Sequence, residues 1–149
     1  MLNRNLLLLI AGMSAFVIPF QAIINSRLGK LSGNPVFAAV VSFTGGTLAL
    51  GIILLFWSRG VPKMPEGVQI PWYLYIGGLL GAVYVTTALT LVPKIGTANF
   101  IAATIVGQLI MSMLIDHLGL IGIEKNPISI TKVAGAILLI GGMLLIQKN

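Results

Sequence analysis

The side chains best suited to chemistry lie on one long apolar segment, residues 97–119, where Thr104, Gln108, Ser112 and Asp116 are spaced four apart. At 3.6 residues per turn each step of four advances by about 40°, so in a helix these side chains form one slowly winding stripe. Their hydroxyl, amide and carboxylate groups can hydrogen-bond a polar solute or a neighbouring helix. A glutamine in the middle of a bilayer-length segment is costly without a partner, so the stripe predicts a binding site or a helix contact.

A second polar face is expected on the first apolar segment, where Ser14, Gln21 and Asn25 follow spacings of seven and four. Pro19 lies inside this segment, and because proline removes a backbone hydrogen bond we expect a kink there and a free carbonyl at Ala15. This face could contact a solute together with the stripe described above. It could equally hold two helices together, and the sequence favours neither interpretation.

The elements that must position these groups are membrane-spanning helices. Of the 149 residues 57% are hydrophobic and only 8% are charged, whereas a soluble domain carries roughly 25% charged residues. The N-terminal apolar run is too long for a signal peptide and four more runs follow it, so we interpret it as the first span. Each run has roughly the 20 residues that cross a bilayer as a helix. The predicted spans are Leu6–Ile24, Val36–Trp57, Trp72–Val92, Ala98–Ile115 and Ile130–Ile146.

Together these spans predict an all-α integral membrane protein with a single transmembrane domain, residues 1–149. Small residues at helix-packing intervals in the second, third and fifth spans indicate a compact bundle. The third span also carries Tyr84 among threonines, and Tyr84 is the better candidate for lining a cavity because threonine hydroxyls often bond their own helix. Trp57 and Trp72 predict an aromatic belt on the side of the 58–71 loop.

The ionisable residues exclude several functions. The charged residues lie at the ends of the apolar runs, so the net charge of +6 indicates headgroup anchoring and not nucleic-acid binding. Cysteine is absent and the one histidine, His117, stands beside Asp116, where helical neighbours point about 100° apart and make a poor metal or catalytic pair. We expect no enzyme activity, metal or cofactor, a capping or headgroup role for His117, and a helix end at Gly119.

The distribution of positive charge between the two sides is nearly even. Five spans place the termini on opposite sides, and Lys and Arg then divide five to four, so the bias that normally fixes orientation is almost absent. Both orientations could coexist, and two copies could pair antiparallel as an inverted-repeat transporter. The N-terminal side would hold Arg4, Arg59, Lys63, Lys125 and Lys132, and the other side Arg27, Lys30, Lys94 and Lys148.

Four stretches of the sequence form a recognisable set: FQAIINSRLG at 20–29, NPVFAAVVSFTGG at 34–46, WYLYIGGLLGAVYV at 72–85 and GQLIMSMLIDHLGL at 107–120. Together they resemble the YdcZ family of the drug/metabolite transporter superfamily. The resemblance implies a multi-pass protein of the bacterial inner (cytoplasmic) membrane that transports a small solute. It also implies short chains that work as dual-topology homodimers, opposed pairs or fused doubles. The motif matches carry a functional role over to Gln21, Arg27, Gln108 and Asp116.

The resemblance and the residues together suggest a mechanism. We expect an antiparallel homodimer in the lipid bilayer that moves a solute by alternating access. Small multidrug-resistance proteins of the same superfamily use a membrane-embedded glutamate, but here Glu66 and Glu124 lie in predicted loops and Asp116 at a helix end. A neutral or anionic cargo is therefore favoured over a drug cation. The expected lining residues are Gln21, Asn25, Ser42, Tyr84, Thr104, Gln108 and Ser112.

Arg27 and Asp116 raise a further possibility, because they close predicted helices on opposite sides of the membrane. In an antiparallel pair they would meet across the dimer and could gate access as an ion pair. Otherwise Arg27 reaches lipid phosphates and Asp116 meets Lys125 in its own loop. Two rival interpretations stay open, a non-transporting membrane subunit and one half of an obligate heterodimer.

Overall fold

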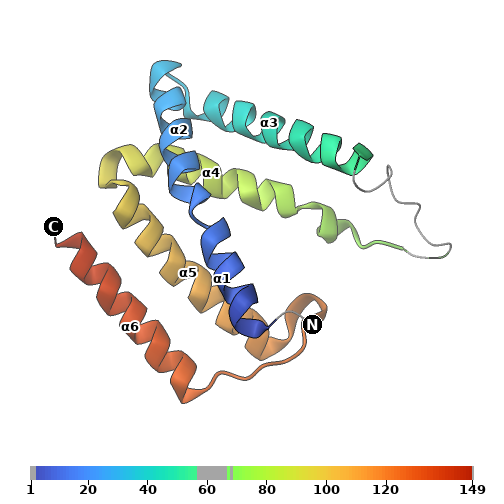
Figure 1. Ribbon diagram of the computed structural model, residues 1–149, viewed down its shortest axis with the longest axis vertical. Helices are drawn as coiled ribbons and strands as arrows, with labels where there is room; N and C mark the ends of the chain where they lie inside the picture. The colour runs from blue at the N-terminus through green and yellow to red at the C-terminus, as the bar shows by residue number, and fades with distance from the viewer. Residues whose placement is uncertain (1–2, 57–66, 68, 149) are drawn as a thin grey trace. The chain divides into compact units, whose positions relative to one another are not determined.

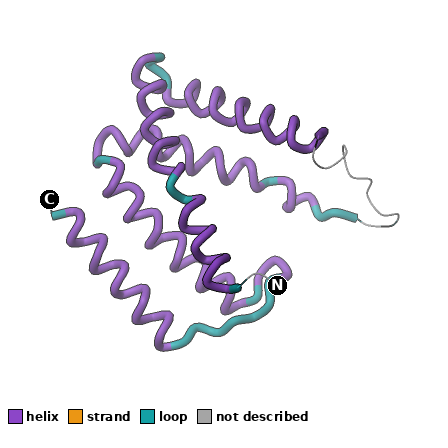
Figure 2. Tube along the Cα trace, viewed as in Figure 1, coloured by secondary structure: helices purple, strands orange, loops and turns teal. Residues whose placement is uncertain are grey.

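The computed structural model describes the whole chain except residues 1–2, 57–66, 68 and 149, and all its elements are helices (Figures 1 and 2). The chain divides into two compact units, Met1–Lys94 and Ile95–Asn149. Five helical segments are long and apolar enough to cross a membrane, which confirms the predicted all-α class and the number of spans. They are Arg4–Leu31, Pro35–Phe56, Trp72–Ile95, Thr97–Leu118 and Ile130–Gln147.

The first span is broken into α1 (Arg4–Ser14) and α2 (Val17–Leu31). The predicted kink is present, but it lies at Ala15 and Phe16, one turn before Pro19, which stands in the first turn of α2. The prediction that the carbonyl of Ala15 is free was wrong. Proline has no N–H to offer this carbonyl, but the chain tightens at the break and the N–H of Ile18 donates to it at 3.1 Å.

The α2 helix runs beyond the expected end at Ile24, so most of the predicted turn after it is helical. The true turn is short and leads to α3 (Pro35–Phe56). The Asn34 side chain caps α3, since its Oδ1 accepts from the N–H groups of Val36 and Phe37 at 2.9 and 3.2 Å. Pro35 follows at the first helical position, where its missing N–H is harmless. Asn25 and Arg27 therefore lie within a helix and not at its end.

The third span begins with the 3₁₀ helix η1 (Trp72–Tyr75) and continues as α4 (Gly77–Ile95). The aromatic residues of η1 are exposed, as a belt at a membrane interface requires. Four residues used in the predictions lie outside the described residues: Trp57 of the belt, Arg59 and Lys63 of the charge count, and Glu66 of the argument about the cargo.

A small apolar core joins α2, α3 and α4 in the first unit. Ala38 and Ala39 of α3 and Leu89 of α4 are buried, and Leu28 and Val85 pack against them. The small alanine side chains allow the helices to approach closely at this end of the unit, where α2 ends and α3 begins.

The second unit consists of two long helices that lie side by side, α5 (Thr97–Leu118) and α6 (Ile130–Gln147). The predicted helix end at Gly119 is confirmed: this residue has φ of 66° and its N–H donates to the carbonyl of Ile115 at 2.9 Å. The short 3₁₀ helix η2 (Leu120–Gly122) and an extended segment lead to α6. Ser129 caps α6 by accepting from the N–H of Lys132 at 3.2 Å.

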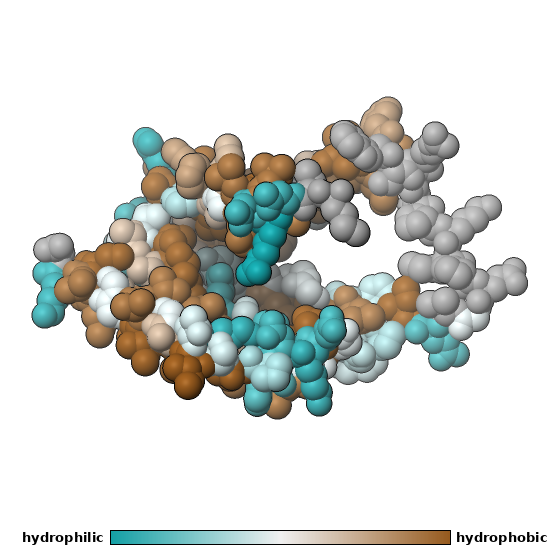
Figure 3. All heavy atoms as spheres, turned by 60° about the horizontal axis from the view of Figure 1, so that its bottom comes forward, coloured by the Kyte–Doolittle hydropathy of each residue, from teal (hydrophilic) through white to brown (hydrophobic). Residues whose placement is uncertain are grey.

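The helices present apolar side chains outward, and hydrophobic atoms cover much of the face seen in Figure 3. Leu8 and Phe56, for example, are 61% and 84% exposed, which suits contact with lipid and not with water. Several glycines expected to pack closely make no such contact with the described residues of their own unit. A Cβ added at Gly45, Gly46 or Gly141 would meet nothing within 4 Å, whereas one at Gly81 would touch the Phe43 ring at 3.4 Å.

Candidate functional site

Polar side chains from α2 and α3 meet in the first unit. The Asn25 amide donates from Nδ2 to Oγ of Ser42 at 3.0 Å, and Asn25 is only 8% exposed. One turn away from Asn25, Gln21 lines a cavity of about 250 Å³ together with Ser42 and Thr47. The structure thus brings three of the predicted lining residues, Gln21, Asn25 and Ser42, to one place between two membrane spans.

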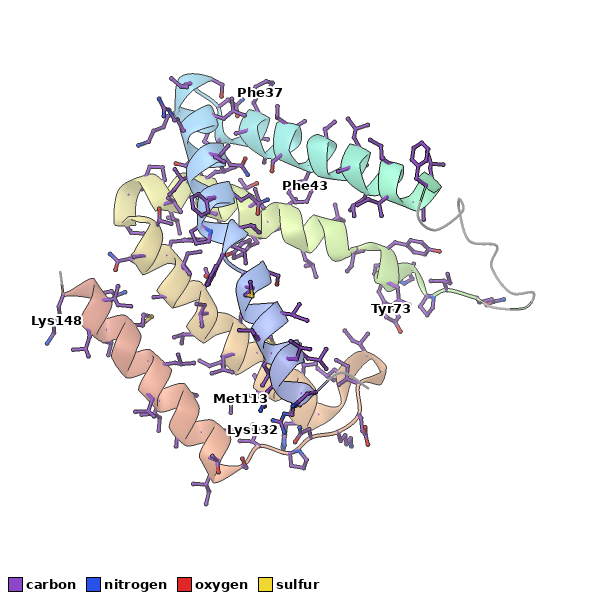
Figure 4. All side chains as sticks on the ribbon, viewed as in Figure 1. Phe37, Phe43, Tyr73, Met113, Lys132 and Lys148 are labelled. Atoms are coloured by element: carbon purple, nitrogen blue, oxygen red, sulfur yellow. The ribbon has the colours of Figure 1, made fainter. Side chains whose placement is uncertain are left out.

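The chemistry of this cavity is hydrogen bonding in an otherwise apolar setting. Ser42 accepts from Asn25, so its own hydroxyl proton remains available to donate. Phe43, Gly46 and Leu50 complete the lining, and no charged side chain takes part. Figure 4 labels Phe43, which extends from α3 toward α4, in agreement with its contact at Gly81. Such a cavity can select a neutral polar group, because water competes weakly for hydrogen bonds there.

The polar stripe of α5 lies in the second unit, and its members differ in environment. The Thr104 hydroxyl donates to the carbonyl of Ile101 at 3.0 Å, so its proton is committed to its own helix. Gln108 is exposed near the middle of α5. Ser112 and Asp116 line a cavity of about 370 Å³ between α5 and α6, whose other lining includes Lys132 and Met113.

Asp116 lies in the last turn of α5, which ends at Leu118, so it stands near the helix end as the sequence predicted, and it is half-buried. The backbone carbonyl of Asp116 accepts from the N–H of Asn126 at 2.8 Å. The Lys132 ammonium, labelled at the start of α6 in Figure 4, donates to the carbonyls of Asn126 and Pro127 at 3.3 and 3.4 Å. These contacts hold the segment before α6 against the end of α5.

Lys132 was missed as a site residue because the sequence argument counted it only as a headgroup anchor. The spacing along the helix could have identified Lys132. Gly135 and Leu139 follow Lys132 by three and seven residues, so all three lie on one helix face, and all three line the same cavity. A capping or headgroup role was predicted for His117. It does not cap α5, since its Nδ1 accepts from the N–H of Ile128 at 3.3 Å and so ties down the segment before α6. The headgroup role stays a prediction.

Two further residues were predicted to belong to the site, Tyr84 and Arg27. Tyr84 is half-buried on α4, and Arg27 is exposed on α2. Within the residues that the structure describes, no group of three or more His, Cys, Asp or Glu side chains could hold a metal ion.

Five apolar helices of bilayer length with hydrogen-bonding groups between them define a multi-pass integral membrane protein. Residues 5–145 match the family described as "Putative inner membrane exporter, YdcZ", and the chain belongs to this family. A similar curated protein is "Inner membrane protein YdcZ" of Escherichia coli (strain K12), which is 24% identical over 149 residues and is covered, like this chain, over 99% of its length. No solved structure matches the chain.

These matches confirm the resemblance drawn from the four sequence stretches and the expected inner-membrane location. The description of the family is that of a membrane exporter, which suggests a transporter rather than an enzyme.

Proposed function

We propose that this chain exports a small neutral or anionic solute across the inner membrane by alternating access, as an antiparallel dimer of two identical copies. The observation that carries the proposal is the cavity between α2 and α3, where Gln21 lines the wall and the bonded pair Asn25 and Ser42 stands beside it. Polar groups inside membrane spans are expensive, and a cluster of three on two helices suits a solute pathway. Family membership supports an export function in general.

The antiparallel arrangement rests on the charge count of the sequence. Lys and Arg divide five to four between the two sides, too evenly to fix one orientation. An inverted-repeat transporter needs two oppositely oriented halves, and two copies of a single domain, residues 1–149, would supply both. The open glycines on α3 and α6 offer surfaces on which a second copy could approach closely.

The charge of the cavities supports a neutral or anionic cargo. No charged group lines the cavity between α2 and α3. Asp116 lines the cavity between α5 and α6 together with Lys132, so the two ionisable residues of this lining carry no net negative charge that would attract a cation. Tyr84, Thr104, Gln108 and Ser112 remain proposed members of the pathway in the assembled dimer.

Arg27 and Asp116 are proposed as an intersubunit pair that gates access. Arg27 is exposed on α2 and so can reach a second copy. Cysteine substitutions at the two positions test the contact, because the native chain contains no cysteine. A covalent dimer from a mixture of the two single mutants supports the pair. Its absence, with efficient crosslinking at another dimer position, removes the pair from the proposal.

The cargo is sought by a broad screen for solutes that raise the melting temperature of the purified protein, since a ligand that binds only the folded state stabilises it. The responding solute is then tested on Gln21→Leu and Gln108→Leu, with dimer content measured in parallel. Gln147→Leu is the matched control, because it makes the same change at the end of α6. Loss of response with an intact dimer supports the pathway.

Loss of the dimer and of the response together would instead favour a subunit whose polar groups only join helices. A protein that forms no homodimer and binds no solute until a second, related chain is added would favour one half of an obligate heterodimer.

A further inference from the structure

A second cavity in the first unit has a different chemistry, that of an anion site. It measures about 420 Å³ and lies where α2 ends, α3 begins and α4 ends. Lys30 and Lys94 both line it, together with the hydroxyl-bearing residues Ser26 and Thr90. The helix ends place it at one edge of the membrane-spanning part of the unit, at the depth where headgroups and water begin.

The two ammonium groups have no local counter-charge. The lining contains no carboxylate. In the whole stretch 1–94 the sequence has six Lys and Arg residues and a single acidic residue, Glu66, which lies outside the described residues. Two cations that share one cavity repel each other, so their arrangement favours a bound anion.

The usual structural role of such lysines, neutralising the carbonyls at helix ends, does not account for Lys30. Two carbonyls of the last turn of α2 already accept backbone hydrogen bonds: the N–H of Ser32 donates to Leu28 at 2.9 Å and that of Gly33 donates to Lys30 at 3.3 Å. The Ser32 hydroxyl lies 3.4 Å from the carbonyl oxygen of Gly29 and 3.3 Å from that of Asn34, and its one proton can serve either. The Lys30 side chain is therefore free to serve a ligand.

Ser26 supplies an independent sign of a ligand. It is only 7% exposed, it lines this cavity, and its hydroxyl makes no hydrogen bond to any of the described residues. The hydroxyl oxygen itself keeps some accessible surface, since among the described residues only Asn99 Oδ1 is a fully buried side-chain oxygen or nitrogen without a partner. An anion oxygen in the cavity could therefore reach the Ser26 hydroxyl and accept its proton. Thr90 contributes no donor, since its hydroxyl is committed to the carbonyls of Thr86 and Thr87 at 3.1 and 2.9 Å.

We propose that the cavity formed by Lys30, Lys94 and Ser26 binds a phosphate group. Two ammonium groups and one hydroxyl match a phosphate with several acceptor oxygens, and basic pockets between membrane helices are suited to headgroup phosphates. The group belongs either to an anionic lipid of the bilayer or to a free phosphate-bearing solute. The site is separate from the uncharged cavity of Gln21 and Ser42, and it stands whether or not that cavity carries the exported solute.

The test uses the full chain purified in a neutral detergent, with the melting temperature as the readout. One series adds inorganic phosphate against equal ionic strength of chloride, and another adds phosphatidylglycerol against phosphatidylcholine. A rise with phosphate identifies a free anion, and a rise with phosphatidylglycerol alone identifies a lipid. No rise in either series overturns the proposal.

Variants connect the response to the cavity. Lys30→Gln and Lys94→Gln should each weaken the apparent affinity about tenfold, as expected for the loss of one hydrogen bond to a charged group. Ser26→Ala should weaken it less and should not lower the stability of the unliganded protein. Lys148→Gln, beyond the end of α6, is the control and should leave the affinity unchanged. Equal loss in this control, or full affinity in the double variant of Lys30 and Lys94, refutes the site.

Discussion

Removing the hydroxyl of Ser42 is the sharpest test of whether the contact between α2 and α3 contributes to stability, to ligand binding or to both. Ser42→Ala deletes the acceptor of the 3.0 Å bond from Asn25 and leaves an amide that is 8% exposed without its partner. Hydrogen bonds between membrane helices average about 0.6 kcal/mol and reach about 1.7. Because the amide stays buried when its partner is lost, we expect a value in the upper half of this range, about 1–1.7 kcal/mol.

A double-mutant cycle isolates this energy. The free energy of unfolding is measured in bilayer-like micelles for the wild type, Ser42→Ala, Asn25→Ala and the double variant, and the coupling term should fall between about 0.6 and 1.7 kcal/mol. Thr44→Ala removes a hydroxyl from the same helix two residues away and should show no coupling to Asn25. A coupling energy of zero for Ser42 and Asn25 would refute the contact.

The same variants separate the two interpretations of the polar face. If Ser42 only joins helices, Ser42→Ala lowers the melting temperature but the folded protein still responds to the exported solute. If Ser42 also lines the pathway, the response is lost even at temperatures where the variant is fully folded.

Three further outcomes are expected. Gly119→Ala should destabilise the chain by about 1–2 kcal/mol because alanine would be forced to φ of 66°. The loss should be larger still because the added Cβ would lie 2.6 Å from Cγ of Lys125. Gly122→Ala, with φ of 79° and open space around it, should show the backbone cost alone. Thermal or denaturant unfolding compares the two. Ser129→Ala should cost about 1 kcal/mol in the same assay, because it removes the N-cap of α6. Reporters fused at the C-terminus should give comparable cytoplasmic and periplasmic signals. Three lysines added to the turn between α2 and α3 should shift the signal to one side of the membrane. A signal on one side alone in the unmodified chain would contradict dual topology.

The number and class of the helices could be predicted because a bilayer imposes a strict physical requirement. A segment must be about 20 residues long, apolar and internally hydrogen-bonded, and five runs of this sequence meet that requirement. The residues at which the helices begin and end were harder to predict. Arg27, Lys30 and Pro93 fall outside the predicted spans, yet all three lie within helices. A long basic side chain can remain helical and extend to the interface, so charge marks the depth of a residue better than the end of its helix.

The candidate site, like the helices, could be predicted only in part from the sequence. Asn25 and Ser42 were both chosen from the sequence, but their contact depends on how α2 and α3 are aligned after a short turn. That alignment is set by the Asn34 cap and by Gly29, where an added Cβ would lie 3.3 Å from Cα of Pro35. No periodicity within one helix contains this information. Lys132 was missed for a related reason, since its cavity needs two helices to exist.

The size of the cavity at Gln21 bears on the proposal that a second copy takes part. Its volume of about 250 Å³ falls below the roughly 300–1,000 Å³ of pockets that enclose small molecules, and its lining comes from α2 and α3 alone. Gln21 itself is exposed, so one side of the cavity is open within the first unit. In a bilayer that open side would face hydrocarbon, where an amide lacks partners and a polar solute would not stay bound. A second copy placed against the open side would supply the missing wall and additional donors, which is the physical reason for proposing that transport needs the dimer.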